Sequence, residues 1–329
     1  MVALTCIHMP YNVAIVGPAR SRQGTGPYVA KVFHQLGAHL SAVVSSSRQS
    51  AVKAADHLNK DYGIDCLAFA DMEEMLGSTS VDIVAICSPA TAHYQHLIPA
   101  VEAGCHVLCE KPLWWPREEV KTESDFRQIM TETTRLVRLC NRNHTVLQLN
   151  TQWVFTLPGY HELYPQRNQP VRAIESISMW LSPQSTGKDM IVDAAPHFLS
   201  MLYALLGAGR INDIQHSRLT GNPAQGLHIK FDYLHATGDC KADLSLSPTD
   251  SVPRPATYAI NHQRVDRHVD LPNYLISLQA PGKQLPIVDP LVCSIKNFIG
   301  SIHARSTPDE TALIDGMEHL LQLYQAVDS

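Results

Sequence analysis

The stretch Asn12–Pro27, NVAIVGPARSRQGTGP, decides the fold of the first half of the chain. It begins with a short apolar run that ends on Gly17, and a segment compatible with a helix follows at about 26–37. Glycines between a first strand and a first helix let the backbone approach a pyrophosphate at the N-terminus of the helix. The stretch therefore predicts a phosphate-binding turn that contains Gly17, Gly24 and Gly26.

The spacing of these glycines departs from the usual G-x-G-x-x-G, because Ala19 and Arg22 occupy the second and third glycine positions. The loop is either a turn without a ligand or a dinucleotide-binding loop. Its place at the start of a strand–helix series favours the second interpretation. Arg20 and Arg22 either contact phosphate or are solvated loop charges.

Strand-like and helix-like segments alternate over residues 1–150. The strand-like runs are continuously apolar, which is typical of a parallel sheet covered by helices on both faces. The runs cover 12–17, 39–45, 66–70, 81–89, 105–112 and 145–150, and the main helical patterns cover 26–37, 49–60, 91–103 and 122–140. This order predicts a doubly wound Rossmann domain with its ligands outside the carboxyl ends of the strands.

Residues 151–329 follow a different pattern. Alternating segments near 172–182, 226–236 and 255–268 are separated by turn residues, which predicts a mainly antiparallel sheet. Helical patterns cover 189–206, 289–304 and 308–327. The sequence thus predicts an α/β protein with a Rossmann domain at 1–150 and an α+β domain at 151–329.

The composition of the 329-residue chain, 45% hydrophobic and 17% charged, is typical of an ordinary soluble globular protein. A net charge of −5 without a basic stripe argues against nucleic acid or an anionic membrane as a partner. No apolar run approaches the roughly 20 residues that span a bilayer. Eight cysteines without a CxxC pair favour reduced thiols in the cytoplasm, and the histidines lack the spacing of a metal site.

The end of the second predicted strand reads Ser45-Ser46-Ser47-Arg48. An acidic residue there would bind the ribose 2′-hydroxyl of NAD, whereas an arginine accommodates the 2′-phosphate of NADP. The lack of a carboxylate favours NADP and does not exclude NAD. A serine that caps the next helix, followed by an exposed arginine, is a compatible interpretation.

The fourth predicted strand ends in Cys87-Ser88-Pro89 and is followed by His93. Small residues at a strand end leave room for a cofactor, and we expect these three to line it. His93 either lies at the same mouth or is a capped or surface histidine.

The fifth predicted strand ends in Glu110-Lys111-Pro112, within CEKPLWWP. Charged residues rarely enter a core unless they are paired. A lysine at this carboxyl edge would face the nicotinamide and could hydrogen-bond an alcohol or its alkoxide. Glu110 would pair with Lys111 or hold cofactor groups, and an ordinary ion pair at a strand end is the alternative.

Asp193 and His197 stand four residues apart within the helical pattern at 189–206, so they share a helix face. A histidine beside a carboxylate has a biased protonation equilibrium and can act as a general base. The alternative is an exposed ion pair that contributes little to stability.

Taken together, these residues resemble the glucose–fructose oxidoreductase, inositol dehydrogenase and rhizopine-catabolism family, written Gfo/Idh/MocA. The resemblance rests on the order of the Rossmann half, EKP at 110–112 and D-x-x-x-H at 193–197, and on the closing helical segments at 289–327. It covers nearly the whole chain. It implies a second domain whose large open sheet mediates a homodimer or homotetramer, and a cis Lys111–Pro112 bond. We also expect the last helix to pack back on the first domain.

The resemblance implies a role for each catalytic candidate. Lys111 would hold the reacting hydroxyl, and Asp193 would orient His197, which would remove the hydroxyl proton as hydride leaves for the nicotinamide. Substrate contacts would come from four further residues, each of which could instead pack or lie on the surface: Gln152, Trp153, Tyr160 and Lys188.

The expected activity is therefore hydride transfer between NAD(P) and a secondary hydroxyl of a sugar or nucleotide-linked sugar. The loop GPARSRQGTGP resembles members that oxidise the 3-hydroxyl of nucleotide-linked N-acetylglucosamine, such as UDP-N-acetylglucosamine. Two alternatives stay open, an NADPH-dependent keto-sugar or imine reductase and a non-catalytic dinucleotide-binding sensor. The presence of Lys111, Asp193 and His197 argues against the sensor.

Overall fold

The computed structural model describes residues 11–18, 25–165, 173–219, 226–271 and 273–327. Contacts between residues divide the chain into two compact units. Unit 1 comprises residues 1–119, 131–150 and 294–309, and unit 2 comprises residues 120–130, 151–293 and 310–329.

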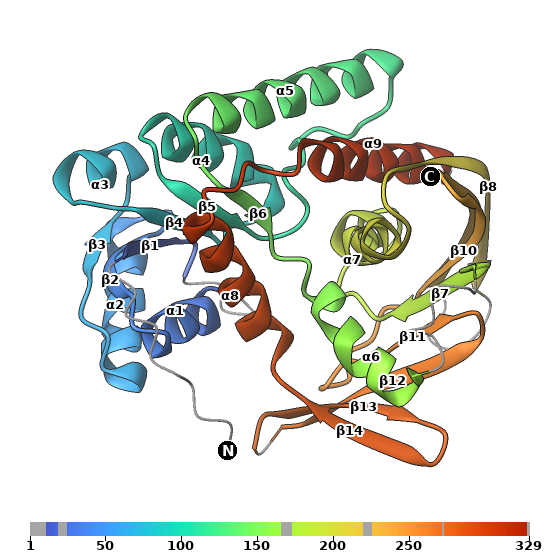
Figure 1. Ribbon diagram of the computed structural model, residues 1–329. Coiled ribbons are helices and arrows are strands. Elements are labelled where there is room, and N and C mark those ends of the chain that lie inside the picture. Colours follow the sequence, from blue (N-terminus) through green and yellow to red (C-terminus); the bar gives the residue numbers. More distant parts are fainter. Residues whose placement is uncertain (1–10, 19–24, 166–172, 220–225, 272, 328–329) are drawn as a thin grey trace. The chain divides into compact units, whose positions relative to one another are not determined.

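Unit 1 contains a six-stranded parallel sheet in the order β3-β2-β1-β4-β5-β6, labelled in Figure 1. The strands are β1 (Asn12–Val16), β2 (His39–Val44), β3 (Leu67–Phe69), β4 (Ile83–Ile86), β5 (His106–Cys109) and β6 (Leu147–Leu149). This is the strand order of a dinucleotide-binding Rossmann domain, which has its switch point between β1 and β4. The prediction of a doubly wound first domain is confirmed.

Two helices of unit 1, α2 and α3, begin at side chains that cap them. They are α1 (Gly26–Gln35), α2 (Arg48–Tyr62), α3 (Met72–Ser78), α4 (Ala90–Glu102) and most of α8 (Pro290–His303), and α5 (Glu123–Arg142) is shared between the two units. Ser47 caps α2 by accepting from Ser50 N at 3.2 Å, and Asp71 caps α3 by accepting from Glu74 N at 2.8 Å. Both caps lie directly after the carboxyl ends of strands, where the ligand site is expected.

Unit 2 contains an eight-stranded sheet in the order β14-β13-β12-β11-β7-β10-β9-β8. All its strand pairs are antiparallel except β7–β10, which is parallel. The strands are β7 (Ser176–Leu181), β8 (Gly209–Leu219), β9 (Gly226–His235), β10 (Gly238–Leu246), β11 (Ala256–Ile260), β12 (Gln263–Asp270), β13 (Leu275–Ala280) and β14 (Lys283–Ile287). The predicted large, mainly antiparallel second sheet is confirmed.

One segment of that sheet differs from its prediction. Residues 255–268 were expected as a single alternating strand, but they form the hairpin of β11 and β12, in which Ile260 pairs with Gln263. Asn261 and His262 make the turn with φ of 45° and 66°, the left-handed values that a tight two-residue hairpin requires. The Asn261 side chain also accepts from Ser176 N at 3.0 Å, which joins the turn to β7.

The inner face of this sheet is covered by helices of unit 2. These are the short η1 (Gln152–Thr156) and α6 (Leu157–Leu163), with α7 (Asp189–Leu206) and α9 (Glu310–Ala326). Helix α7 is long and apolar enough to cross a membrane, but 56% of it is buried against its neighbours, as in the core helix of a globular unit. It contacts η1, α9, β7 and β10.

The last helix was expected to pack on the first domain, and this stays a prediction. Helix α9 belongs to unit 2, where its apolar side, including Leu313, Met317 and Leu320, is buried and contacts α7 and β8. The segment that belongs to unit 1 is Ser294–Asp309. There Ser294 accepts from Gln148 Nε2 at 3.0 Å through its carbonyl, which joins α8 to β6.

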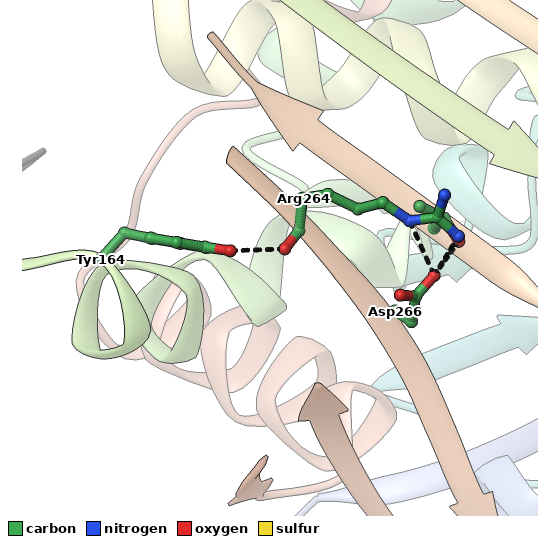
Figure 2. A network of polar contacts seen from close by, with 4 residues as sticks. Tyr164, Arg264 and Asp266 are labelled. Atoms are coloured by element: carbon green, nitrogen blue, oxygen red, sulfur yellow. Dashed lines mark hydrogen bonds and ion pairs between the residues drawn. The ribbon is translucent and has the colours of Figure 1, made fainter. Parts of the chain in front are cut away.

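The other face of β12 is polar. Arg264 forms an ion pair with Asp266 at 2.6 Å, and its backbone carbonyl accepts from the Tyr164 hydroxyl at 2.6 Å (Figure 2). Thr257 on β11 donates to the same Asp266 carboxylate at 2.5 Å. Arg264 and Asp266 therefore balance each other's charge on this face.

Gly17 should be essential for the stability of unit 1, and its replacement by alanine tests this. Gly17 has φ of +82°, and a Cβ there would lie 2.6 Å from the backbone of Ser88. Gly104 has a similar φ of +80°, but nothing lies within 4 Å of the position of its Cβ.

Gly104→Ala should therefore lose about 1 kcal/mol from backbone strain, and Gly17→Ala about 2–5 kcal/mol from strain and overlap together. Urea denaturation of both variants measures the difference. Equal losses would show that the contact with Ser88 relaxes without cost.

Candidate functional site

A pocket of about 720 Å³ lies at the carboxyl ends of β1, β2 and β4 in unit 1. Five residues that the sequence predicted for the cofactor line it: Gly17, Ser45, Ser46, Ser88 and Pro89. This is the edge at which open α/β sheets bind their ligands, next to the switch point. Five strand-end residues, separate in the sequence, are thus brought into one site.

The walls of the pocket fit a dinucleotide. The hydroxyl of Ser45 is buried, with 8% of the residue exposed, and it makes no hydrogen bond among the described residues. A buried polar group without a partner is costly, so a bound group that reaches it gains a hydrogen bond at no loss to the protein. Gly17 also brings the β1 loop against the backbone of Ser88, which closes the pocket between β1 and β4.

The N-terminus of α1 is a second feature of the pocket that suits a dinucleotide. Gly26 is buried at the first position of α1, and a Cβ there would lie 2.8 Å from Pro18 Cα. Pro18, shortly after β1, therefore lies close to the helix N-terminus, where backbone N–H groups favour a phosphate. Arg20, Arg22 and Gly24 lie outside the described residues, so their predicted phosphate contacts remain predictions.

Ser47 and Arg48 do not line the pocket. Ser47 is the N-cap of α2, which agrees with the capping interpretation of the sequence. Arg48 lies beside the pocket, because its guanidinium donates to the carbonyl of Ala68 on β3. A guanidinium has five N–H donors, and this bond uses one of them.

His93 is buried beneath the site, with 1% of the residue exposed. Its Nε2 lies 2.9 Å from the carbonyl oxygen of Ser88 and its Nδ1 lies 2.9 Å from that of Pro112. Burial lowers the pKa of His93, and the hydrogen bonds to these carbonyls raise it in part. His93 therefore links the pocket wall to the lysine loop from below.

His96 adds a neutral side chain to the pocket wall. Its Nδ1 lies 3.1 Å from the hydroxyl of Ser88, and burial, with the nearby His93, lowers the pKa of His96 to about 4. The imidazole is thus uncharged near neutral pH.

The predicted lysine loop is held firmly within unit 1. The Lys111–Pro112 bond is cis, as the resemblance implies. Glu110 accepts from Asn150 Nδ2 at 2.7 Å, and Trp114 Nε1 donates to Thr133 Oγ1 at 3.0 Å. Trp115 N donates to the carbonyl of Ala90 at 3.1 Å, so the two tryptophans anchor the loop to α4 and α5.

Two thiols are among the buried groups next to this loop. Cys87 and Cys109 are buried, and Cys109 Sγ lies 3.5 Å from His93 Nδ1. Burial raises the pKa of the Cys109 thiol well above its usual range, so it is neutral. The predicted place of Cys87 near the cofactor corresponds to a position directly behind the pocket wall.

Asp193 and His197 lie one turn apart on α7 in unit 2. Both are half-buried, between buried neighbours such as Val192 and Phe198. Ser185 donates to Asp193 Oδ2 at 3.3 Å. The predicted shared face is present, although Pro196 lies within the helix between them.

The four predicted substrate residues are also in unit 2. Tyr160 is fully buried, and its hydroxyl lies 3.2 Å and 3.1 Å from the carbonyls of Ile260 and Gln263. Trp153 is 6% exposed and packs edge-on against Tyr258. Gln152 is half-buried at the start of η1, and Lys188 Nζ lies 4.5 Å from the ring centroid of Tyr324. Tyr160 and Trp153 thus have clear packing roles, and their contact with substrate stays a prediction.

Several pocket residues were not predicted from the sequence: Asp71, Glu73, Gln95, His96 and Arg117. A signal existed for Asp71, because a helix cap directly after a predicted strand lies at the same carboxyl edge as the other candidates. Among the described residues, no group of three or more His, Cys, Asp or Glu side chains could hold a metal ion.

Residues 11–151 match the Gfo/Idh/MocA oxidoreductases, a family described as having an NAD-binding Rossmann fold. Over these residues, the chain is therefore similar to the Gfo/Idh/MocA oxidoreductases. The residues that line the pocket at the carboxyl ends of β1, β2 and β4 all lie within the region that matches this NAD-binding family.

Among curated Gfo/Idh/MocA relatives, the D-glucoside 3-dehydrogenase of Escherichia coli K12 is 38% identical over 212 residues, 62% of this chain and 56% of that protein. The UDP-N-acetylglucosamine 3-dehydrogenase of Acidithiobacillus ferrooxidans is 28% identical over 205 residues, 61% of this chain and 56% of that protein. The aligned regions thus span just over half the length of these relatives.

Solved structures show the same fold over the whole chain. UDP-N-acetylglucosamine 3-dehydrogenase GnnA from Acidithiobacillus ferrooxidans matches with a TM-score of 0.68 and 19% identity, covering 97% of this chain and 98% of GnnA. The apo scyllo-inositol dehydrogenase of Lactobacillus casei matches with a TM-score of 0.71 and 16% identity, covering 97% and 96%. At these identities the likeness concerns the fold alone.

Ser45→Ala should separate cofactor binding from stability. The Ser45 hydroxyl makes no hydrogen bond within the described residues, so its removal should leave the free energy of unfolding unchanged or slightly raised. If a bound dinucleotide uses this hydroxyl, its Kd should rise about 3- to 10-fold, the loss of one hydrogen bond.

Ser41→Ala on the same strand is the matched control, because Ser41 donates to the carbonyl of Val13 at 3.4 Å and does not line the pocket. It should lower stability by about 0.5–1 kcal/mol and leave cofactor binding as it was. Calorimetric titration with NADH and NADPH and urea denaturation give both quantities. An unchanged Kd for Ser45→Ala would remove this hydroxyl from the cofactor site.

Proposed function

We propose that the protein is an NAD(P)-dependent dehydrogenase that acts on a secondary hydroxyl, at C3, of a sugar or nucleotide-linked sugar. The observation that carries the proposal is the anchored Glu110-Lys111-Pro112 loop, which His93 ties to the wall of the cofactor pocket. The half-buried Asp193 and His197 supply a second requirement of the reaction, a base with a carboxylate on the same helix face.

In this proposal, the bound nicotinamide supplies the hydride acceptor. The Lys111 ammonium donates a hydrogen bond to the reacting hydroxyl oxygen and stabilises the negative charge that develops on it. The His197 imidazole accepts the hydroxyl proton, and the Asp193 carboxylate favours the imidazolium that results. Proton removal by such a base typically accelerates a reaction about 10²- to 10⁴-fold.

The choice of C3 is supported by the names of two relatives. Both D-glucoside 3-dehydrogenase and UDP-N-acetylglucosamine 3-dehydrogenase are dehydrogenases named for position 3. Position 3 is therefore the hydroxyl that we propose, and the group attached to the sugar stays open between a simple glycoside and a nucleotide.

NADP is the cofactor that we propose in preference to NAD. No carboxylate ends β2, and Arg48 lies beside the pocket that Ser45 and Ser46 line. A guanidinium there suits a 2′-phosphate. The same observation favours a second candidate, the reverse reaction, in which NADPH reduces a keto-sugar or an imine.

The cellular setting completes the proposal. Each of the seven cysteines in the described residues is a free thiol, and most are buried, which supports a reducing compartment such as the cytoplasm. We retain the homodimer or homotetramer that the family resemblance implies, with the open sheet of unit 2 as its interface.

Lys111→Ala should abolish turnover without loss of cofactor binding. The lysine acts on developing charge, so kcat should fall about 10²- to 10⁴-fold while the Kd for NADPH changes less than about threefold. Nicotinamide absorbance measures turnover with UDP-N-acetylglucosamine and with methyl glucoside. Lys60→Ala, on the exposed end of α2, serves as the control and should behave as wild type. Substantial activity of Lys111→Ala would remove this lysine from the mechanism.

Arg48→Ala should weaken NADP binding about tenfold and leave NAD binding nearly unchanged, because only NADP carries the 2′-phosphate. Titration with both cofactors measures the ratio of their Kd values. Gln49→Ala, at the next position of α2, controls for general effects on the helix start. Equal weakening of both cofactors would contradict the assignment of Arg48.

A further inference from the structure

The inner face of β12 carries an arginine at a position where the alternation of buried and exposed side chains predicts an apolar residue. Side chains alternate between the two faces of a strand, so Arg267 shares a face with Val265, which is fully buried. Across the sheet, Arg267 pairs with Leu278 on β13, which is also fully buried. A guanidinium in such a layer is unusual unless a partner neutralises it.

The described residues offer Arg267 no carboxylate. Its Nη2 donates to the carbonyl of Arg254 at 2.8 Å, and the centre of its guanidinium lies 5.2 Å from the ring centroid of Trp153. Its Nε is buried and makes no hydrogen bond within the described part of the chain. Burial lowers the pKa of Arg267, Tyr274 raises it, and the positive charge of Arg254 lowers it further.

Arg264, three residues earlier, shows the usual arrangement. It lies on the polar face of β12 and is paired with Asp266 at 2.6 Å (Figure 2). Arg264 therefore has a carboxylate as its partner. Arg267, by contrast, has a second cation, Arg254, nearby.

That second cation, Arg254, stands next to the proposed catalytic pair. Burial lowers the pKa of Arg254 and the Asp193 carboxylate raises it, so the two charges interact. The backbone explains the proximity, because Ala256 at the start of β11 pairs with Leu181 at the end of β7. The segment after β7 carries Ser185, which donates to Asp193.

We propose that Arg254 and Arg267 form a subsite for an anionic group of the substrate, a phosphate or a carboxylate, beside Asp193. Arg254 lies near the Asp193 carboxylate, and Arg267, which donates to the Arg254 carbonyl, keeps a buried N–H donor unused. An anion there takes that donor and balances the charge, in the way that arginine commonly holds phosphates and carboxylates. The inference rests on the proposed function, since it names the class of substrate for that reaction. Trp153 then acts as the platform that holds Arg267 in place.

Binding of two anions to the cofactor-loaded protein tests the subsite. UDP supplies a diphosphate and D-glucuronate supplies a carboxylate, and saturating NADPH or NADH keeps UDP out of the dinucleotide pocket. At least one of them should raise the melting temperature of the wild type, because it binds the folded state only. If UDP raises the melting temperature, the result indicates a nucleotide-linked sugar as the substrate. If glucuronate raises it, the result indicates a sugar acid.

Two variants each remove one of the two arginine charges of the proposed subsite, and one matched control variant leaves both in place. Arg267→Met retains a long apolar side chain on the inner face, and Arg254→Gln changes a half-buried loop residue, so a folded variant is available even if one fails to fold. Each should weaken anion binding at least tenfold. Arg264→Gln, on the opposite face of β12, should bind the anion as the wild type does. Lack of binding by the wild type, or wild-type affinity in both variants, overturns the subsite.

Kinetics keep this inference distinct from the proposed function. In the wild type, kcat/KM should be higher for UDP-N-acetylglucosamine or a glucuronide than for uncharged methyl glucoside. In Arg267→Met, kcat/KM should fall at least tenfold more for the anionic sugar than for methyl glucoside. If no sugar is oxidised, the proposed function fails, but anion binding still decides the arginine subsite. If methyl glucoside is oxidised and neither anion binds, the activity stands and the subsite is wrong.

Discussion

A buried imidazole links the two strand ends on which the cofactor-binding unit depends. His93 is 2.9 Å from the carbonyl oxygens of both Ser88 and Pro112, so it joins the end of β4 to the loop after β5. Ser88 lines the pocket at the carboxyl ends of β1, β2 and β4, and Pro112 follows the proposed catalytic lysine. Both residues are buried, and the imidazole is the polar group beside their carbonyls: a neutral ring donates to one carbonyl at a time, and an imidazolium donates to both.

The two units handle charge differently. In unit 1 the carboxylate of Asp71 caps α3, and Arg48 donates to a β3 carbonyl, so polar groups near the pocket also hold the strand ends. In unit 2 the outer face of β12 carries the paired Arg264 and Asp266, while its inner face carries Arg267 without a carboxylate. Departures from local rules of this kind are expected where a protein binds or reacts.

Much of the fold could be predicted from local pattern. Continuous apolar runs such as Ile83–Ile86 become parallel strands buried on both faces, and the helical pattern at 189–206 corresponds to α7. The hairpin at 255–268 was missed because Asn261 and His262 form its turn in place of the common Asn-Gly pair. An apolar stripe shows that α9 packs, and only the structure shows its contacts with α7 and β8.

The sequence by itself determined the Rossmann half, the strand-end loop that carries Lys111, and the single turn of helix between Asp193 and His197, since each depends on residues close together in the chain. Only the tertiary structure decided that Ser45 has an unused buried hydroxyl, that both nitrogens of His93 face carbonyls, and that Arg267 lies inward near Arg254 and Trp153. These features arise from strand register and packing between residues that are up to about a hundred positions apart, and local pattern carries no information on such contacts.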